Sequence, residues 1–117
     1  MSNTLSWAAS VRAEGVVRAL YGASANACVD PGDVAEAAVR TLTEDGHAGR
    51  AYTLTGPAAV TPVRQTEQLG EALGVSLRFE ELGPERALAA LRARHPEPVA
   101  RALLASALRQ REGRRPR

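Results

Sequence analysis

Apolar and polar side chains alternate over residues 50–55, where Tyr52 and Leu54 share one face of an extended chain. Alternation with a period of two is typical of a strand that is buried on one face, and a glycine–proline pair ends this one sharply. A second alternating run follows at residues 75–80. We therefore predict two strands, over residues 50–55 and 75–80, at the centre of the fold.

Helix start and stop signals flank the first of these strands on both sides. Asp30 is a preferred N-cap residue, proline follows it at the first helical position, and residues 34–42 then show helical periodicity. Thr61, also followed by proline, begins a second helix, which Gly74 ends because glycine adopts the left-handed conformation without steric cost. A strand, a helix and a further strand predict a right-handed parallel crossover and an α/β fold.

The two ends of the chain are predicted from the same signals. We predict a helix from Asn3 or Thr4 to Glu14, an extended or looped run at residues 16–20, a helix opened by Pro84 and broken at His95-Pro96, and a last helix that ends near residue 108. Residues 1–108 are expected to form one domain, and residues 109–117 to form a basic, disordered tail.

The composition predicts a thin core. Alanine is the commonest apolar residue, isoleucine is absent, and the chain has one Phe, one Trp and two Tyr. Because alanine buries little surface, at about 25 cal/mol per Å² the hydrophobic contribution per residue is small for a chain of this length. Such a chain gains stability from a partner surface.

The charged residues exclude several functions. The net charge is +2, and the five arginines of the tail have no aromatic residue among them to stack on bases, so we expect no nucleic-acid partner. Lysine is absent, which excludes a Schiff-base lysine and a phosphate-loop lysine. A single cysteine, Cys28, fits a reducing compartment. The sequence contains no run of about 18 apolar residues, so we predict no membrane-spanning segment. We expect a cytoplasmic protein.

Few residues are candidates for chemistry. No glycine-rich loop joins a strand to a helix, so we expect no cofactor cradle in this chain, and no ligand set predicts a metal site. Asp30 and Asp33 are explained as the cap and first turn of a helix. Asn3 and Trp7 remain, either as a helix cap and a core indole or as the wall of a pocket. The catalytic residues are not predicted.

The order of motifs carries a family resemblance. The motifs are Asn3-Thr-Leu-Ser-Trp7, Asp30-Pro-Gly-Asp-Val-Ala-Glu-Ala-Ala38, Gly49-Arg-Ala-Tyr-Thr-Leu-Thr-Gly-Pro57, Leu69-Gly-Glu-Ala-Leu-Gly74 and Arg78-Phe-Glu-Glu81. In this order they resemble the C-terminal half of the NmrA-like NAD(P)-binding proteins, a group of atypical short-chain dehydrogenases/reductases. The resemblance covers nearly the whole chain.

The resemblance implies a partial Rossmann-like α/β fold, with a strand–helix–strand unit and a helical substrate lobe. It implies that the glycine-rich NAD(P) loop and most of the parallel sheet lie outside this sequence, as in a truncated oxidoreductase. It also raises Asn3 and Trp7 as residues that bind a small-molecule substrate.

Two hypotheses follow from this resemblance. In the first, the chain is the substrate-side segment of an NAD(P)-dependent reductase, inactive alone and completed by a chain that supplies the missing Rossmann half. In the second, it is a stand-alone interaction or regulatory module derived from that fold, for example as a homodimer.

Overall fold

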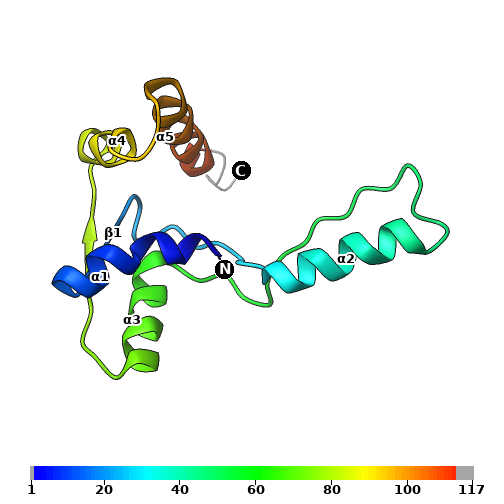
Figure 1. Cartoon of the computed structure of the whole chain (residues 1–117), viewed down its shortest axis with the longest axis horizontal. Coiled ribbons are helices and arrows are strands. Elements are labelled where there is room, and N and C mark those ends of the chain that lie inside the picture. The colour runs from blue at the N-terminus through cyan, green and yellow to red at the C-terminus, as the bar shows by residue number, and fades with distance from the viewer. Residues whose placement is uncertain (1, 113–117) are drawn as a thin grey trace.

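Two short parallel strands form the centre of the folded body, in a computed structural model that describes residues 2–112 (Figure 1). Strand β1 is Val16–Ala19 and strand β2 is Arg78–Glu81. Their register places Val17 opposite Phe79. The valine is fully buried, which identifies β1 as the strand that the core is built around.

The sheet differs from the prediction in its first strand. We predicted that residues 50–55 would pair with residues 75–80, whereas β2 pairs with β1. The second strand is confirmed, although it begins only at Arg78. The run at residues 16–20, for which the sequence left extended and looped conformations open, contains the partner strand. A strand is defined by its backbone partner, and local alternation does not identify that partner.

The N-terminal helix ends at Glu14, as predicted. A 3-10 segment, η1 at Ser2–Trp7, leads into helix α1 at Ala8–Glu14. Gly15 ends α1 with a positive φ of 66°, and its N–H donates to the carbonyl oxygen of Val11 at 3.0 Å. The left-handed glycine then turns the chain directly into β1.

Helix α3, Pro62–Leu73, covers the sheet and is bounded as predicted. The hydroxyl of Thr61 accepts a hydrogen bond from the N–H of Arg64 at 3.1 Å, and Gly74 ends the helix with a φ of 68°. Gly70 is buried in this helix, where an added Cβ would lie 2.8 Å from the carbonyl oxygen of Val75. Glycine at this position therefore lets the helix approach the chain that leads into β2.

Two further helices complete the body. Helix α4 is Pro84–Arg92 and helix α5 is Glu97–Glu112, and they pack on each other through small buried residues, Ala87 and Ala100. The predicted break at His95-Pro96 separates them. Helix α5 continues past the expected domain boundary at residue 108 to Glu112, so residues 109–112 are helical and not disordered; the rest of the predicted tail lies outside the described residues. Within residues 2–112, no helix is long and apolar enough to span a membrane.

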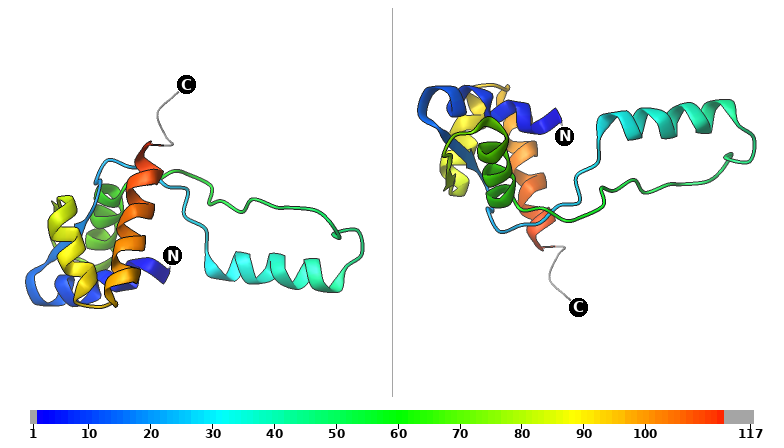
Figure 2. Two further views of the ribbon diagram at one scale, coloured as in Figure 1. Left: turned by 90° about the horizontal axis from the view of Figure 1, so that it is seen from above. Right: turned by 90° about the horizontal axis from the view of Figure 1, so that it is seen from below.

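Helix α2, Pro31–Thr43, projects from this body as an arm (Figures 1 and 2). Its predicted cap is confirmed, because the Asp30 carboxylate accepts a hydrogen bond from the N–H of Gly32 at 2.7 Å. The chain returns from the arm tip in an extended conformation. The radius of gyration is 16.8 Å, against about 13 Å for a compact domain of this length. The arm accounts for the difference.

The returning segment is where the predicted strand over residues 50–55 was placed. Residues 51–56 have no secondary structure, and Tyr52 and Leu54 are 51% and 43% exposed. The prediction is therefore wrong for this structure. The physical reason is that the segment has the side-chain pattern of a strand but no neighbouring strand in the described chain to satisfy its backbone groups.

Candidate functional site

A cavity of about 870 Å³ opens in the folded body, beside the carboxyl ends of both strands and against α4 and α5. Its apolar wall contains Trp7, Leu20, Leu82, Leu91 and Leu103. Concave sites with apolar walls and a few polar groups are the usual form of small-molecule sites. This cavity is therefore the candidate site of the chain.

The sequence forms this wall by two local devices. Leu20 and Leu82 follow β1 and β2 directly, and the N–H of Leu82 donates to the carbonyl oxygen of Ala19 at 2.9 Å, which extends the parallel ladder by one bond. On α4, Ala87, Ala90 and Leu91 lie three and four positions apart, so helical periodicity directs them to one face. Strand ends and a helix face thus meet at the cavity.

The N-terminal segment supplies the indole. Trp7 lines the cavity and is half-buried, and the hydroxyl of Ser10 donates to its carbonyl oxygen at 3.1 Å. Asn3, the other predicted substrate-binding residue, lies in η1, and its side chain is outside the described residues. The substrate-binding role of both residues stays a prediction.

One basic residue of the cavity is held by two carboxylates. Arg18 forms ion pairs with Glu14 and, at 3.1 Å, with Glu80 on the neighbouring strand. Hydrogen bonds from Arg86 and Arg18 lower the pKa of Glu80, and the hydrogen bond from Arg18 lowers the pKa of Glu14. The charge of Arg18 is thus compensated inside the protein.

Arg94 is different. Its guanidinium donates to the carbonyl oxygen of Ser6 at 3.4 Å, which links the end of α4 to η1 across the cavity. Among the side chains that the structure describes (residues 4–109), no carboxylate forms an ion pair with Arg94, whereas Arg92, two positions earlier, is bound to Glu97 at 2.6 Å. Arg94 therefore keeps its positive charge at the rim of the cavity.

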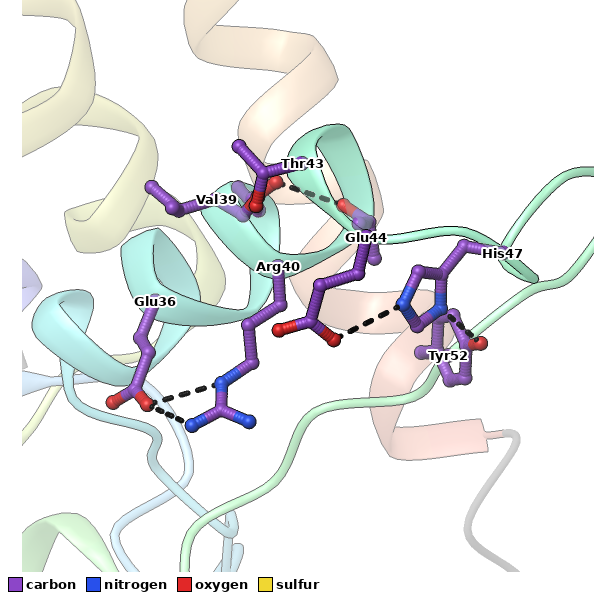
Figure 3. Close-up of polar contacts among 9 residues, drawn as sticks. Glu36, Val39, Arg40, Thr43, Glu44, His47 and Tyr52 are labelled. Carbon is purple, nitrogen blue, oxygen red and sulfur yellow. Dashed lines mark hydrogen bonds and ion pairs between the residues drawn. The ribbon is translucent and has the colours of Figure 1, made fainter.

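A second hollow, of about 590 Å³, lies in the arm between α2 and the returning segment. Figure 3 shows its polar end, where His47 Nδ1 lies 2.7 Å from the Tyr52 hydroxyl and His47 Nε2 lies 3.8 Å from Glu44. The hollow is also lined by Val34 of α2 and by Leu54 of the returning segment. The His47–Tyr52 contact joins the turn that follows α2 to the returning segment, so we interpret it as structural.

The residues at the carboxyl ends of the strands do not form an NAD(P) site. A pyrophosphate is held by glycine backbone N–H groups at a helix N-terminus that follows a strand. Here β2 leads into α4, but the first helical residue is Pro84, which has no N–H, and Glu85 adds a carboxylate to the first turn of the helix. These residues do not fit a dinucleotide phosphate. Within the described part of the chain, no group of acidic, histidine or cysteine side chains is arranged to hold a metal ion either.

Sequence reasoning missed most of the cavity. Leu20, Leu82 and Arg94 were not singled out, because each follows an element boundary and carries no motif of its own. Periodicity on α4 identifies a buried face but does not say that the face borders a hollow.

Known proteins similar to this chain are reductases. The chain is 60% identical over 113 residues, which is 97% of its length, to the (4-alkanoyl-5-oxo-2,5-dihydrofuran-3-yl)methyl phosphate reductase of Streptomyces griseus. It is 32% identical over 91 residues, 78% of its length, to the NAD(P)H azoreductase of Xenophilus azovorans. It spans 40% and 32% of the lengths of these two relatives. No protein-family profile matches the chain.

Comparison of the backbone with solved structures also identifies reductases as similar proteins. The NADPH-dependent quinone oxidoreductase QOR2 of Escherichia coli superposes with a TM-score of 0.77 at 29% identity, over 90% of this chain and 38% of that one. The chain therefore has an α/β fold that resembles part of the Rossmann-like NAD(P)-dependent reductases, and the predicted fold class is confirmed.

Proposed function

We propose that this chain is the substrate-side part of an NAD(P)H-dependent reductase of the NmrA-like type, within the atypical short-chain dehydrogenases/reductases. The ordered motifs noted in the sequence support this subgroup, and the 60% identity to the reductase of Streptomyces griseus supports reduction as the chemistry. By that relationship, the substrate is a small molecule that carries a phosphate ester and an acyl chain.

The arm is the single observation that carries the proposal. Helix α2 has no buried residue, although it is amphipathic, and its exposed apolar side chains include Val34, Val39 and Leu42. A 13-residue helix that buries no side chain is marginally stable in water, so its apolar face needs a cover. Opposite it, residues 51–55 have a strand's pattern and no strand partner. A parallel sheet satisfies both needs, since it pairs with the segment and packs on the helix.

The cofactor belongs to that covering part. The strand ends of this chain do not fit a dinucleotide phosphate, and its relatives are about two and a half times as long. We therefore propose that NAD(P)H is bound by the missing Rossmann half, supplied by further polypeptide, and that the cavity beside Trp7 presents the substrate to it. Asn3 stays a proposed substrate-binding residue. The 117 residues alone would then neither bind the cofactor nor transfer hydride.

The test is a complementation experiment. The N-terminal part of the Streptomyces griseus relative, which contains the length that this chain does not match, is produced together with the chain. We expect the two to co-purify in equal amounts and to bind NADPH, measured by the change in nicotinamide fluorescence, while the chain alone does not bind it.

A pair of variants on α2, one disruptive and one a control, tests whether the complex forms through the arm. Leu42→Glu places a charge on the exposed apolar face of α2 and should prevent co-purification, whereas Glu36→Gln, on the same helix, should not. Failure to form the complex, together with a stable homodimer in native mass spectrometry, would favour the alternative function as a stand-alone interaction or regulatory module.

A further inference from the structure

The basic residues of the body cavity are the feature that the proposed function does not explain. Among the described residues that line this cavity, the ionisable side chains are all basic: Arg18, Arg94 and His95. Arg18 is compensated by Glu14 and Glu80, so it contributes no net attraction for an anion. The uncompensated charge is that of Arg94, at the end where α4 turns toward α5.

The rest of the wall is apolar. Leu20 and Leu82 lie at the strand ends, Leu91 lies one turn before Arg94, and Leu103 faces them from α5. Trp7 adds a flat apolar surface from the N-terminal segment. The cavity therefore has an apolar interior and one positively charged end. These two regions complement the apolar part and the anionic part of an amphiphilic ligand.

We propose that Arg94, assisted by His95, binds the anionic group of the substrate, and that the leucine wall receives the substrate's hydrocarbon chain. An arginine guanidinium presents parallel N–H donors that match phosphate oxygens, and such charge-assisted hydrogen bonds are stronger than neutral ones. The bond from Arg94 to the Ser6 carbonyl is long, at 3.4 Å, and it occupies only one of the guanidinium N–H donors. His95 adds a ring N–H at the same rim.

The assignment deepens the proposed function and rests on it for the identity of the ligand as substrate. It also makes a separate claim about size, because a cavity of about 870 Å³ accommodates a phosphate together with a chain of several carbons. The ligand class is a phosphate monoester with an apolar substituent. A free inorganic phosphate satisfies only the Arg94 end.

The experiment uses the fluorescence of Trp7, which is the single tryptophan of the chain and lines the cavity. The purified 117-residue chain is titrated with methyl, butyl and hexyl phosphate, with inorganic phosphate and with hexanol. We expect saturable binding of hexyl phosphate, affinity that rises with chain length, and much weaker responses to phosphate or hexanol alone.

Two substitutions of Arg94 and one control substitution isolate the effect of its charge. Arg94→Gln should weaken hexyl phosphate about 10- to 100-fold, and Arg94→Lys should restore part of the affinity because it keeps the charge without the planar fork. Arg12→Gln removes the same charge from α1, outside the cavity lining, and should change the affinity less than about twofold. Circular dichroism of each variant checks that it is folded.

Each outcome decides the assignment. Absence of hexyl phosphate binding by the wild-type chain, equal losses for Arg94→Gln and Arg12→Gln, or affinity independent of chain length would each overturn it. NADPH is absent from this experiment. A negative result here together with successful complementation would remove the anion site and leave the reductase proposal intact, and the reverse pattern would do the opposite.

Discussion

Arg18 and Glu80 lie directly opposite each other on the parallel strands β1 and β2, and their side chains form an ion pair at 3.1 Å. The same guanidinium reaches Glu14 at the end of α1, and the same carboxylate binds Arg86 of α4 at 2.8 Å. A chain of four charges thus connects a helix, two strands and a second helix. Networks of this kind contribute more than isolated surface pairs, although water and salt screen them.

We predict that Arg18→Gln lowers the thermal midpoint of unfolding by a few degrees. The substitution leaves Glu14 without its partner and leaves Glu80 only Arg86, at a place where both strands are short. Differential scanning fluorimetry at low and at high salt is the measurement. The deficit should shrink as salt increases, because screening weakens the network in the wild type. A deficit that salt does not change would mean that Arg18 acts through packing.

The base of the arm depends on a glycine. A Cβ added at Gly56 would overlap the carbonyl oxygen of Cys28, which is backbone and cannot rotate away. We predict that Gly56→Ala separates the two segments at this point and destabilises the protein by about 2 kcal/mol or more. Hydrogen exchange at the Asn26–Val60 bridge and thermal unfolding measure it.

A matched control for this substitution is Gly83→Ala. No atom lies within 4 Å of a Cβ at Gly83, and its φ is −68°, so the side chain is accommodated. Because Gly83 is the N-cap residue of α4, a loss of up to about 1 kcal/mol is expected there. Comparable losses for the two glycines would contradict the clash at Gly56.

The arm should be the least stable part of the isolated chain. We predict that amides of α2 exchange faster than those of α3, because α2 buries no side chain whereas α3 buries Thr66 and Gly70. Asp30→Ala removes the cap and should weaken α2 by about 1 kcal/mol without moving the main unfolding transition. Mass spectrometry of exchange by segment tests both. Protection of α2 in the complemented complex, and not in the chain alone, is the expected mark of docking.

The junction of α4 and α5 is predicted to depend on pH. Hydrogen bonds from Arg92, and then from Arg101, lower the pKa of Glu97 from 4.5 to about 2. A carboxyl group whose pKa is lower in the folded state stabilises the fold above its unfolded pKa, and this contribution is lost as the pH falls through the folded pKa. We therefore expect the junction to loosen between about pH 4.5 and 2.

The matched variant for this titration is Glu97→Gln. It cannot carry the charge, so the part of the pH dependence that belongs to Glu97 should disappear, and nuclear magnetic resonance of the neighbouring amides should no longer show a step in that range. A step of unchanged size in the variant would assign the titration to another carboxyl group.

Several helix boundaries could be predicted from the sequence alone, because each depends on one side chain and the backbone next to it, whereas the end of α5 was placed too early. Asp30 and Thr61 cap their helices, Gly15 and Gly74 end theirs, and the break before Pro96 is where it was predicted. The same locality accounts for the resemblance to reductases, since short ordered motifs survive in a chain that spans only part of its relatives.

The sheet and the cavity were decided by tertiary structure. The alternation at residues 50–55 is genuine, but a strand also needs a neighbour, and β2 is paired with Val16–Ala19 instead. The charge of Arg94 could not be distinguished from that of Arg92 along the chain, because only the folded molecule brings Glu97 to one of them and leaves the other at a cavity. Backbone pairing and charge compensation join residues that are far apart in the sequence. Local sequence patterns therefore do not predict which residues become partners.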